Sequence, residues 1–221
     1  MYTIGLFSAS RFFNKYYESN AINLLVKKGV CMKIIGIVGS SRIGGNTEIL
    51  TRIALEEAEK EGAQTELITL AEKEIKPCDA CRSCKQTGKC HIKDDLPPIL
   101  KKMMAADGII LASPVYFGSA TPKIKALIDR SGYSARGKDG RRPFENKVGG
   151  PIVVARRAGQ NFTYAQLMFF FMITGMIVPG STYWNIAFGR EKGDVLKDEE
   201  GVRTVRIFGE KLAWLAKKIA S

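Results

Sequence analysis

The stretch IIGIVGSSRIGGNTEIL, residues 34–50, decides the fold. Residues 34–38 form an apolar run, which is typical of a strand buried on both faces of a parallel sheet. Residues 39–47 form a loop rich in glycine and hydroxyl groups, and apolar residues then recur at helical spacing over residues 46–61. This order of strand, loop and helix is one βα unit, whose loop lies at the carboxyl end of the strand.

The alternation of strand and helix continues along the chain. Further strands are predicted at residues 65–70, 108–112, 150–155 and 176–179. Further helices are predicted at residues 96–106, 122–131, 164–174 and 201–219. Because crossovers between parallel strands place helices on the faces of the sheet, we predict an α/β fold with a doubly wound, five-stranded parallel sheet.

The composition is that of one folded domain, since 45% of the 221 residues are hydrophobic and 25% are charged. The sequence has no apolar run of membrane-spanning length, and its first residues lack the pattern of a signal peptide. We therefore expect a cytoplasmic protein without a membrane partner. Residues 1–31 show no clear period, and Met32 directly precedes the first strand. We interpret residues 1–31 as an N-terminal extension outside the core and residues 32–221 as the domain.

The segment CDACRSCKQTGKC, residues 78–90, follows the second predicted strand as an insertion. It holds four of the five cysteines of the chain, namely Cys78, Cys81, Cys84 and Cys90. Thiols stay reduced in the cytoplasm, which disfavours disulfides. Structural zinc sites usually join two C-x2-C pairs across a long spacer, whereas this spacing puts all four thiols on one loop, as in segments that hold iron–sulfur cubanes. We predict a [4Fe–4S] cluster, with zinc as the alternative, and expect Cys31 to be a bystander and His91 a solvated loop residue.

The net charge of +12 favours a negatively charged partner. Nucleic acid is disfavoured, because the sequence has neither a helix-turn-helix pattern nor the signature of an RNA-binding module. Basic residues surround the cysteine segment, namely Lys76, Arg82, Lys85, Lys89 and Lys93. They suit the docking of an acidic electron donor, or equally a solvated surface that has no partner.

Two loops are predicted to form a ligand site at the carboxyl edge of the sheet. The loop GSSRIGGNT, residues 39–47, is predicted to hold one phosphate at a helix N-terminus, through Ser40, Arg42, Gly45, Asn46 and Thr47. It lacks the lysine of a Walker A motif and the spacing of a dinucleotide-binding motif. The loop SPVYFGSATP, residues 113–122, is predicted to contact a planar ligand through Pro114, Val115, Tyr116, Phe117, Gly118 and Ser119. The alternatives are a capped helix without a ligand and aromatic rings packed in the core.

A third loop, ARRAGQN at residues 155–161, carries a weaker signal for the same site. It follows the fourth predicted strand, so it should reach the same edge of the sheet. Its candidate residues are Arg157 and Gly159.

These motifs resemble those of the iron–sulfur flavoproteins, a branch of the flavodoxin-like NADPH-dependent FMN reductase group. The likeness rests on GSSRIGGNT, on PVYFGS with the following TPKIKALIDR, and on CDACRSCKQTGKC, and it extends from Met32 to the C-terminus. It implies a flavodoxin-like fold, FMN, a [4Fe–4S] cluster on the four cysteines, a homodimer or homotetramer, and electrons from ferredoxin in an anaerobe. The basic loop at residues 136–142 matches no function of the family.

The resulting hypothesis is an FMN-dependent oxidoreductase with no catalytic side chain assigned. Electrons would pass from a ferredoxin-like acidic donor through the cluster to FMN and on to dioxygen, peroxide or a quinone. One alternative is an NAD(P)H-dependent FMN or quinone reductase with structural zinc, in which Arg136, Arg141 and Arg142 hold the 2′-phosphate of NADPH. Another is a non-enzymatic interaction module that carries flavin or zinc. The helix YAQLMFFFMITGM, residues 164–176, is apolar nearly all round and predicts a homo-oligomer in every case.

Overall fold

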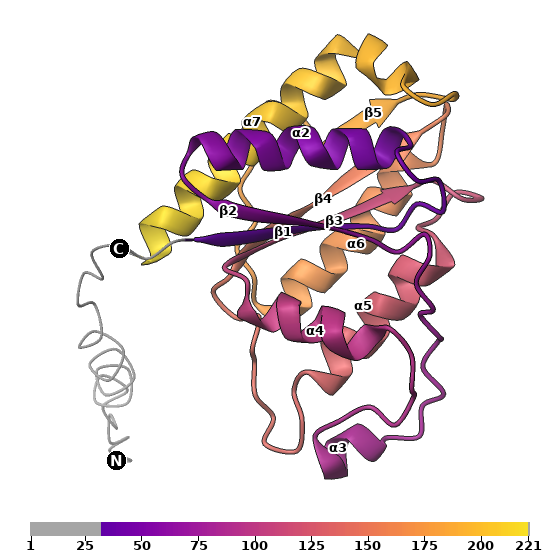
Figure 1. Cartoon of the computed structure of the whole chain (residues 1–221), viewed down its shortest axis with the longest axis vertical. Helices are drawn as coiled ribbons and strands as arrows, with labels where there is room; N and C mark the ends of the chain where they lie inside the picture. The colour runs from indigo at the N-terminus through magenta and orange to yellow at the C-terminus, as the bar shows by residue number, and fades with distance from the viewer. Residues whose placement is uncertain (1–31, 221) are drawn as a thin grey trace, which may run out of the picture. The chain divides into compact units, whose positions relative to one another are not determined.

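A five-stranded parallel sheet forms the centre of the fold in a computed structural model, which describes residues 32–220 (Figure 1). The strands are β1 (Lys33–Val38), β2 (Gln64–Thr69), β3 (Gly108–Pro114), β4 (Val148–Ala155) and β5 (Ile186–Phe188). Their order in the sheet is β2-β1-β3-β4-β5, and all pairs are parallel. From β1 the chain passes to β2 on one side of the sheet and then returns to β3 on the other side of β1. The switch point of this topology therefore lies between β1 and β3. The doubly wound sheet predicted from the sequence is confirmed.

Helices cover both faces of the sheet (Figure 1). One face carries α2 (Asn46–Lys60) and α7 (Glu199–Ala220), and the other carries α4 (Leu96–Ala105), α5 (Pro122–Ser134) and α6 (Gln160–Thr174). Two short helices lie in connections, namely α3 (Ser83–Thr87) and η1 (Asp194–Lys197).

The central strands supply both hydrophobic cores. Ile34 packs in the core with Leu50 and Phe208, whereas its neighbour Ile35 packs in the opposite core with Phe171. Both isoleucines are fully buried, because successive side chains of a strand point to opposite faces. The continuous apolar runs of the sequence therefore mark strands covered on both sides.

The position of the fifth strand was predicted wrongly. The prediction was residues 176–179, but Ile177 forms only an isolated parallel bridge with Val148, and β5 lies further along the chain. Pro179 has no N–H to donate, so pairing does not continue past this bridge. The strand that completes the sheet pairs instead with the carboxyl half of β4, where Ile186 lies opposite Val153.

Two sequence-based expectations concern the limits of the chain. Within residues 32–220, no helix combines the length and the apolar character needed to cross a membrane. The interpretation of residues 1–31 as an extension concerns residues outside the described part.

Candidate functional site

A cavity of about 370 Å³ lies at the carboxyl edge of the sheet. It is formed where the loops after β1, β3, β4 and β5 meet. Its lining residues are Ser40, Arg42, Asn46, Thr47, Pro114, Val115, Tyr116, Val154, Arg156, Gly189, Arg190 and Glu191. The structure thus brings together most of the residues predicted from the first loop and the first half of the second.

The N-terminus of α2 opens onto this cavity. The helix begins after Gly45, which is extended and makes no side-chain cap hydrogen bond, so the first-turn N–H groups have no side-chain acceptor from the cap. Gly44 has a φ of +61° and donates its N–H to Glu48 at 2.7 Å. Burial favours a higher pKa for Glu48, but the hydrogen bonds from Gly44 and Arg52 outweigh it and lower the pKa. Glu48 is therefore ionised at neutral pH and fixes the loop beside the helix N-terminus.

Arg42 and Asn46 line the cavity, but their side chains also hold the segment that follows β5. Asn46 donates from Nδ2 to the carbonyl of Glu191 at 2.8 Å and accepts at Oδ1 from the N–H of Gly193 at 2.8 Å. Arg42 donates from Nη1 to the carbonyl of Arg190 at 3.3 Å. Both residues thus shape the wall of the cavity through partners about 150 positions along the sequence.

The loop after β3 ends in a tight turn. Tyr116 and Ser119 exchange backbone hydrogen bonds of 2.8 and 3.0 Å across it. Phe117 and Gly118 have φ values of +48° and +78°, and the ring of Phe117 is fully exposed. A positive φ is strained for a bulky residue, which points to a functional position. Neither ring belongs to the core, since Tyr116 is also 41% exposed, so the alternative of core packing is wrong.

The rest of this loop supports the turn and lies outside the cavity lining. Ser119 donates its hydroxyl to Gln166 of α6 at 2.8 Å. Gly159 has a φ of +86°, and a Cβ there would lie 2.9 Å from both Gly118 and Val115. Only glycine permits this approach of the two loops. The cavity lining therefore does not include Phe117, Gly118, Ser119 or Gly159. These residues form the turn beside the cavity and the contacts that hold it.

Arg156 contributes to the cavity, whereas the residue predicted from the sequence is its neighbour Arg157. The described residues that line the cavity include Arg156 but not Arg157. Gly189, Arg190 and Glu191 were also missed. The signal for them is the polar sequence GREK directly after the short apolar IAF, a segment that the predicted fifth strand at residues 176–179 left outside the sheet.

The cysteine segment forms a separate site. Cys84 lies buried in α3, Cys90 is half-buried, and Cys78 and Cys81 are exposed. Burial raises the pKa of the Cys84 thiol, and its electrostatic interactions with Cys90, Cys81 and Cys78 raise it further. Cys84 is thus electrostatically linked to each of the other three thiols. Positive φ values at Ala80 and Arg82 turn the chain between the first three of them.

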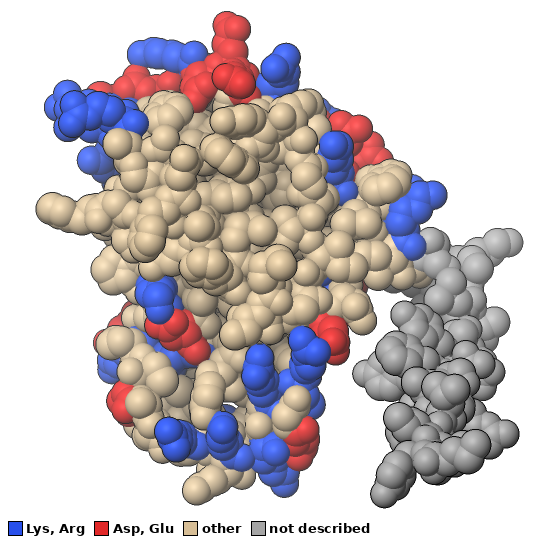
Figure 2. Space-filling model, turned by 180° about the vertical axis from the view of Figure 1, so that it is seen from behind, with Lys and Arg blue, Asp and Glu red and all other residues tan. Residues whose placement is uncertain are grey.

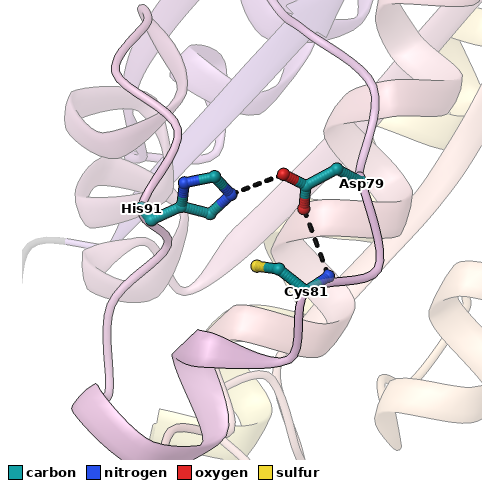
Figure 3. Close-up of side chains that lie close together, drawn as sticks. All are labelled: Asp79, Cys81 and His91. Atoms are coloured by element: carbon teal, nitrogen blue, oxygen red, sulfur yellow. Dashed lines mark hydrogen bonds and ion pairs between the residues drawn. The ribbon is translucent and has the colours of Figure 1, made fainter.

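Asp79, Cys81 and His91 lie together at the surface of this segment (Figure 3). The Nε2 of His91 is 2.6 Å from Oδ2 of Asp79, whose Oδ1 accepts from the N–H of Cys81 at 3.2 Å. The contacts with Cys81 and His91 lower the pKa of Asp79. The candidate ligand atoms of Asp79, Cys81 and His91 all lie within 4.8 Å of one another. Zinc also binds carboxylate, thiolate and imidazole ligands of this kind. His91 is thus exposed as expected, but paired with Asp79.

Comparison with known proteins identifies the family of this chain. The profile of the NADPH-dependent FMN reductase family matches residues 32–191. An iron–sulfur flavoprotein of Methanocaldococcus jannaschii is 46% identical over 200 residues, which cover 85% of this chain and 99% of the relative. The chain belongs to the iron–sulfur flavoproteins of this family. It is accordingly an FMN-dependent oxidoreductase.

Solved structures agree with the flavodoxin-like fold. A flavodoxin, the WrbA-like protein from Agrobacterium tumefaciens, aligns with a TM-score of 0.58 over 85% of this chain and 98% of that chain, at 18% identity. RosB with bound 8-demethyl-8-formylriboflavin-5′-phosphate aligns with a TM-score of 0.67 over 85% of this chain and 80% of that chain, at 20% identity. Both likenesses support the flavodoxin-like architecture of this iron–sulfur flavoprotein.

Proposed function

We propose that this iron–sulfur flavoprotein transfers electrons from a ferredoxin-like acidic protein, through a [4Fe–4S] cluster, to FMN and on to dioxygen, peroxide or a quinone. Family membership indicates FMN and an iron–sulfur cluster as the cofactors. When bound, the cluster handles single electrons and FMN collects two of them for the acceptor. The observation that carries the proposal is the presence of two separate sites, a group of four thiols and a cavity at the switch point of the sheet.

The cavity fits the phosphate end of FMN. Arg42, Arg156 and Arg190 line it, and the uncapped N-terminus of α2 opens onto it, so it favours an anion. We assign the phosphate to Ser40, Arg42, Gly45, Asn46 and Thr47. The loop after β3 offers the exposed Tyr116 and Phe117 for a flat ring system. We assign the ring and ribityl chain to Pro114, Val115, Tyr116, Phe117, Gly118 and Ser119, with Gly159 holding this loop in place.

The cysteine segment fits a cluster. Sulfur is the donor that iron–sulfur clusters require, and the four thiols lie on one short segment with no second cysteine pair among residues 32–220. We assign Cys78, Cys81, Cys84 and Cys90 as the ligands. Since Asp79 and His91 adjoin Cys81, zinc remains the metal to exclude.

Metal and flavin analysis tests the proposed function. Anaerobically purified protein is expected to contain about four iron and four sulfide per chain, since a [4Fe–4S] cubane takes four cysteine ligands. Flavin released by denaturation should be FMN. Stoichiometric zinc with no sulfide would favour the two-electron reductase, and the absence of bound flavin after reconstitution would contradict the proposal.

A basic surface surrounds the cysteine segment and suits an acidic donor. The predicted basic residues Lys76, Arg82, Lys85, Lys89 and Lys93 are all exposed. The loop at residues 136–142, which had no assigned role, lies beside them, because a Cβ on Gly137 would be 3.7 Å from Gly88 (Figure 1). Seen from behind, Lys and Arg side chains gather on the lower part of the molecule (Figure 2). We infer that this loop extends the docking surface.

Charge reversal in the basic loop should slow reduction by ferredoxin. The double variant Lys138→Glu/Arg141→Glu is expected to lower the second-order rate about tenfold or more at low salt, because electrostatic steering raises such rates by about 10- to 1,000-fold. Stopped-flow absorbance would measure the rate, and the control Arg203→Glu/Lys211→Glu makes the same charge change on exposed positions of α7. Equal effects of the two pairs would reject the docking surface. If NADPH reduced the wild-type flavin faster than ferredoxin did, the reductase alternative would replace the proposal.

The outer face of α6 supports a homo-oligomer. Its exposed apolar residues are Phe162, Phe169, Met172 and Ile173, each 64–68% exposed. The last three of them line a groove of about 810 Å³ between α5 and α6. Figure 2 shows a broad area without charged side chains on the side seen from behind. Apolar patches of this kind usually mark an interface. We propose that a second copy of the chain covers it.

Sedimentation velocity tests this interface. The wild-type protein is expected to sediment as a dimer or larger, and Phe169→Glu/Ile173→Glu should shift it toward monomer, because a charge buried at an apolar contact is unfavourable. Lys211→Glu on α7 is the control. A wild-type monomer with both cofactors bound would contradict the proposal.

A further inference from the structure

Arg130 of α5 is a fully buried cation in contact with the cysteine segment. Its side chain is 1% exposed and forms an ion pair with Asp94, whose side chain is 0% exposed. The second contact of the pair, from Nη2 to Oδ1, is 3.1 Å long. Burial favours a lower pKa for Arg130, but the hydrogen bond and charge of Asp94 outweigh it and raise the pKa. The pair is therefore ionised.

The pair holds both ends of the cysteine segment. On the side that precedes the first cysteine, Lys76 donates its N–H to Asp94 at 2.9 Å, and its carbonyl accepts from Nη1 of Arg130 at 3.0 Å. On the side that follows the last cysteine, the carbonyl of Ile92 lies 3.5 Å from Nη2 of Arg130. Because these contacts join residues 76 and 92–94, they close the segment into a loop.

Arg130 also contacts one of the thiols. Its Nη2 donates to Sγ of Cys90 at 3.4 Å, within the range of a hydrogen bond to sulfur. Its Nε is buried and has no hydrogen-bond partner within residues 32–220. An isolated buried cation is costly, and replacement of buried ion pairs by apolar residues is often neutral or stabilising. Stability alone is thus a weak reason for this pair, and the contact with Cys90 indicates a further role.

We propose that Arg130 is a positioning residue of the iron–sulfur cluster, which closes the cysteine loop together with Asp94 and raises the reduction potential of the cluster through its hydrogen bond to Cys90. The inference rests on the proposed function. Reduction adds negative charge to the cluster and its sulfurs, so a donor and a positive charge at Sγ stabilise the reduced form. Asp94 balances the charge of Arg130, so the directed hydrogen bond is the main contribution.

The test uses the protein loaded with both cofactors. Arg130→Gln/Asp94→Asn removes both charges together and leaves no isolated buried ion, while Arg130→Lys keeps the charge but loses the two-pronged geometry. Arg206→Gln is the matched control, because it removes a surface cation of α7 that is paired with Glu57 of α2. Spectroelectrochemical titration would give the midpoint potentials of cluster and flavin separately.

The double variant is expected to lower the midpoint potential of the cluster by at least about 59 mV. This shift corresponds to a tenfold change in the equilibrium constant of one-electron reduction. Arg130→Lys should shift it in the same direction by less, and Arg206→Gln should not shift it. The flavin potential and the FMN content should stay unchanged in all three. A wild-type cluster potential in the double variant would overturn the inference, as would an equal shift in Arg206→Gln.

Loss of the cluster is also informative. If the double variant binds FMN with the thermal midpoint of cluster-free wild type but assembles no cluster, the loop-closing role is supported. If the double variant fails to fold, the Arg130→Lys variant tests the inference. A wild-type cluster potential in Arg130→Lys would mean that Arg130 has a purely structural role, which would overturn the inference. Absence of iron from the wild-type protein would instead defeat the proposed function itself, so the two failures are distinguishable.

Discussion

Replacement of Cys84 by alanine is expected to abolish reduction of the protein by reduced ferredoxin while FMN stays bound and reducible by dithionite. Cys84 is the buried thiol of the four and interacts electrostatically with the other three. Under the proposed assignment, its removal leaves three of the four sulfur ligands of the cluster. We expect the rate of reduction by ferredoxin to fall by at least about 100-fold. Mutation of residues that only hydrogen-bond a metal ligand already lowers metal affinity or activity by about 10- to 100-fold.

FMN should stay bound in this variant. Among the described residues, none of residues 78–90 lines the cavity at the carboxyl edge of the sheet. Stopped-flow spectroscopy at the flavin and cluster bands would follow both electron donors. Cys31→Ala is the matched control, since it removes the one cysteine outside the segment. Wild-type reduction of Cys84→Ala by ferredoxin would refute the entry of electrons through the cysteine segment.

The second large effect is expected at Arg156. Arg156→Ala should weaken FMN binding about 10- to 100-fold, because hydrogen bonds to charged groups are worth about 1.5–3 kcal/mol. Arg156 lines the same cavity as Ser40, Asn46 and Thr47, to which we assign the phosphate. Quenching of flavin fluorescence on titration of the apoprotein with FMN would measure the dissociation constant.

Arg157→Ala is the control for this experiment. It removes the same charge one position later, from an exposed side chain outside the cavity lining of the described chain. Riboflavin, which lacks the phosphate, should bind wild type and Arg156→Ala with similar affinity. If Arg157→Ala alone weakened FMN binding, the original selection of Arg157 from the sequence would be correct and the assignment from the cavity would fail.

The sequence determined the class of fold and the kinds of site. Apolar runs such as residues 34–38 indicate burial of a strand on both faces, and helical spacing in α2 and α7 indicates one covered face, because burial leaves a local period in the sequence. The close spacing of four cysteines likewise indicates a single metal site, since its ligands are neighbours along the chain.

Only the tertiary structure decided which distant segments meet. Two short apolar runs could each have been the last strand, and the choice of β5 depended on pairing with the carboxyl half of β4. That choice brings Arg190 to the cavity, where Arg42 contacts its carbonyl. In the sequence, Arg130 is one basic residue at the end of a helix motif. Its burial, its partner Asp94 and its contact with Cys90 arise from residues 36 and 40 positions away, and contacts at such separations leave no period to read.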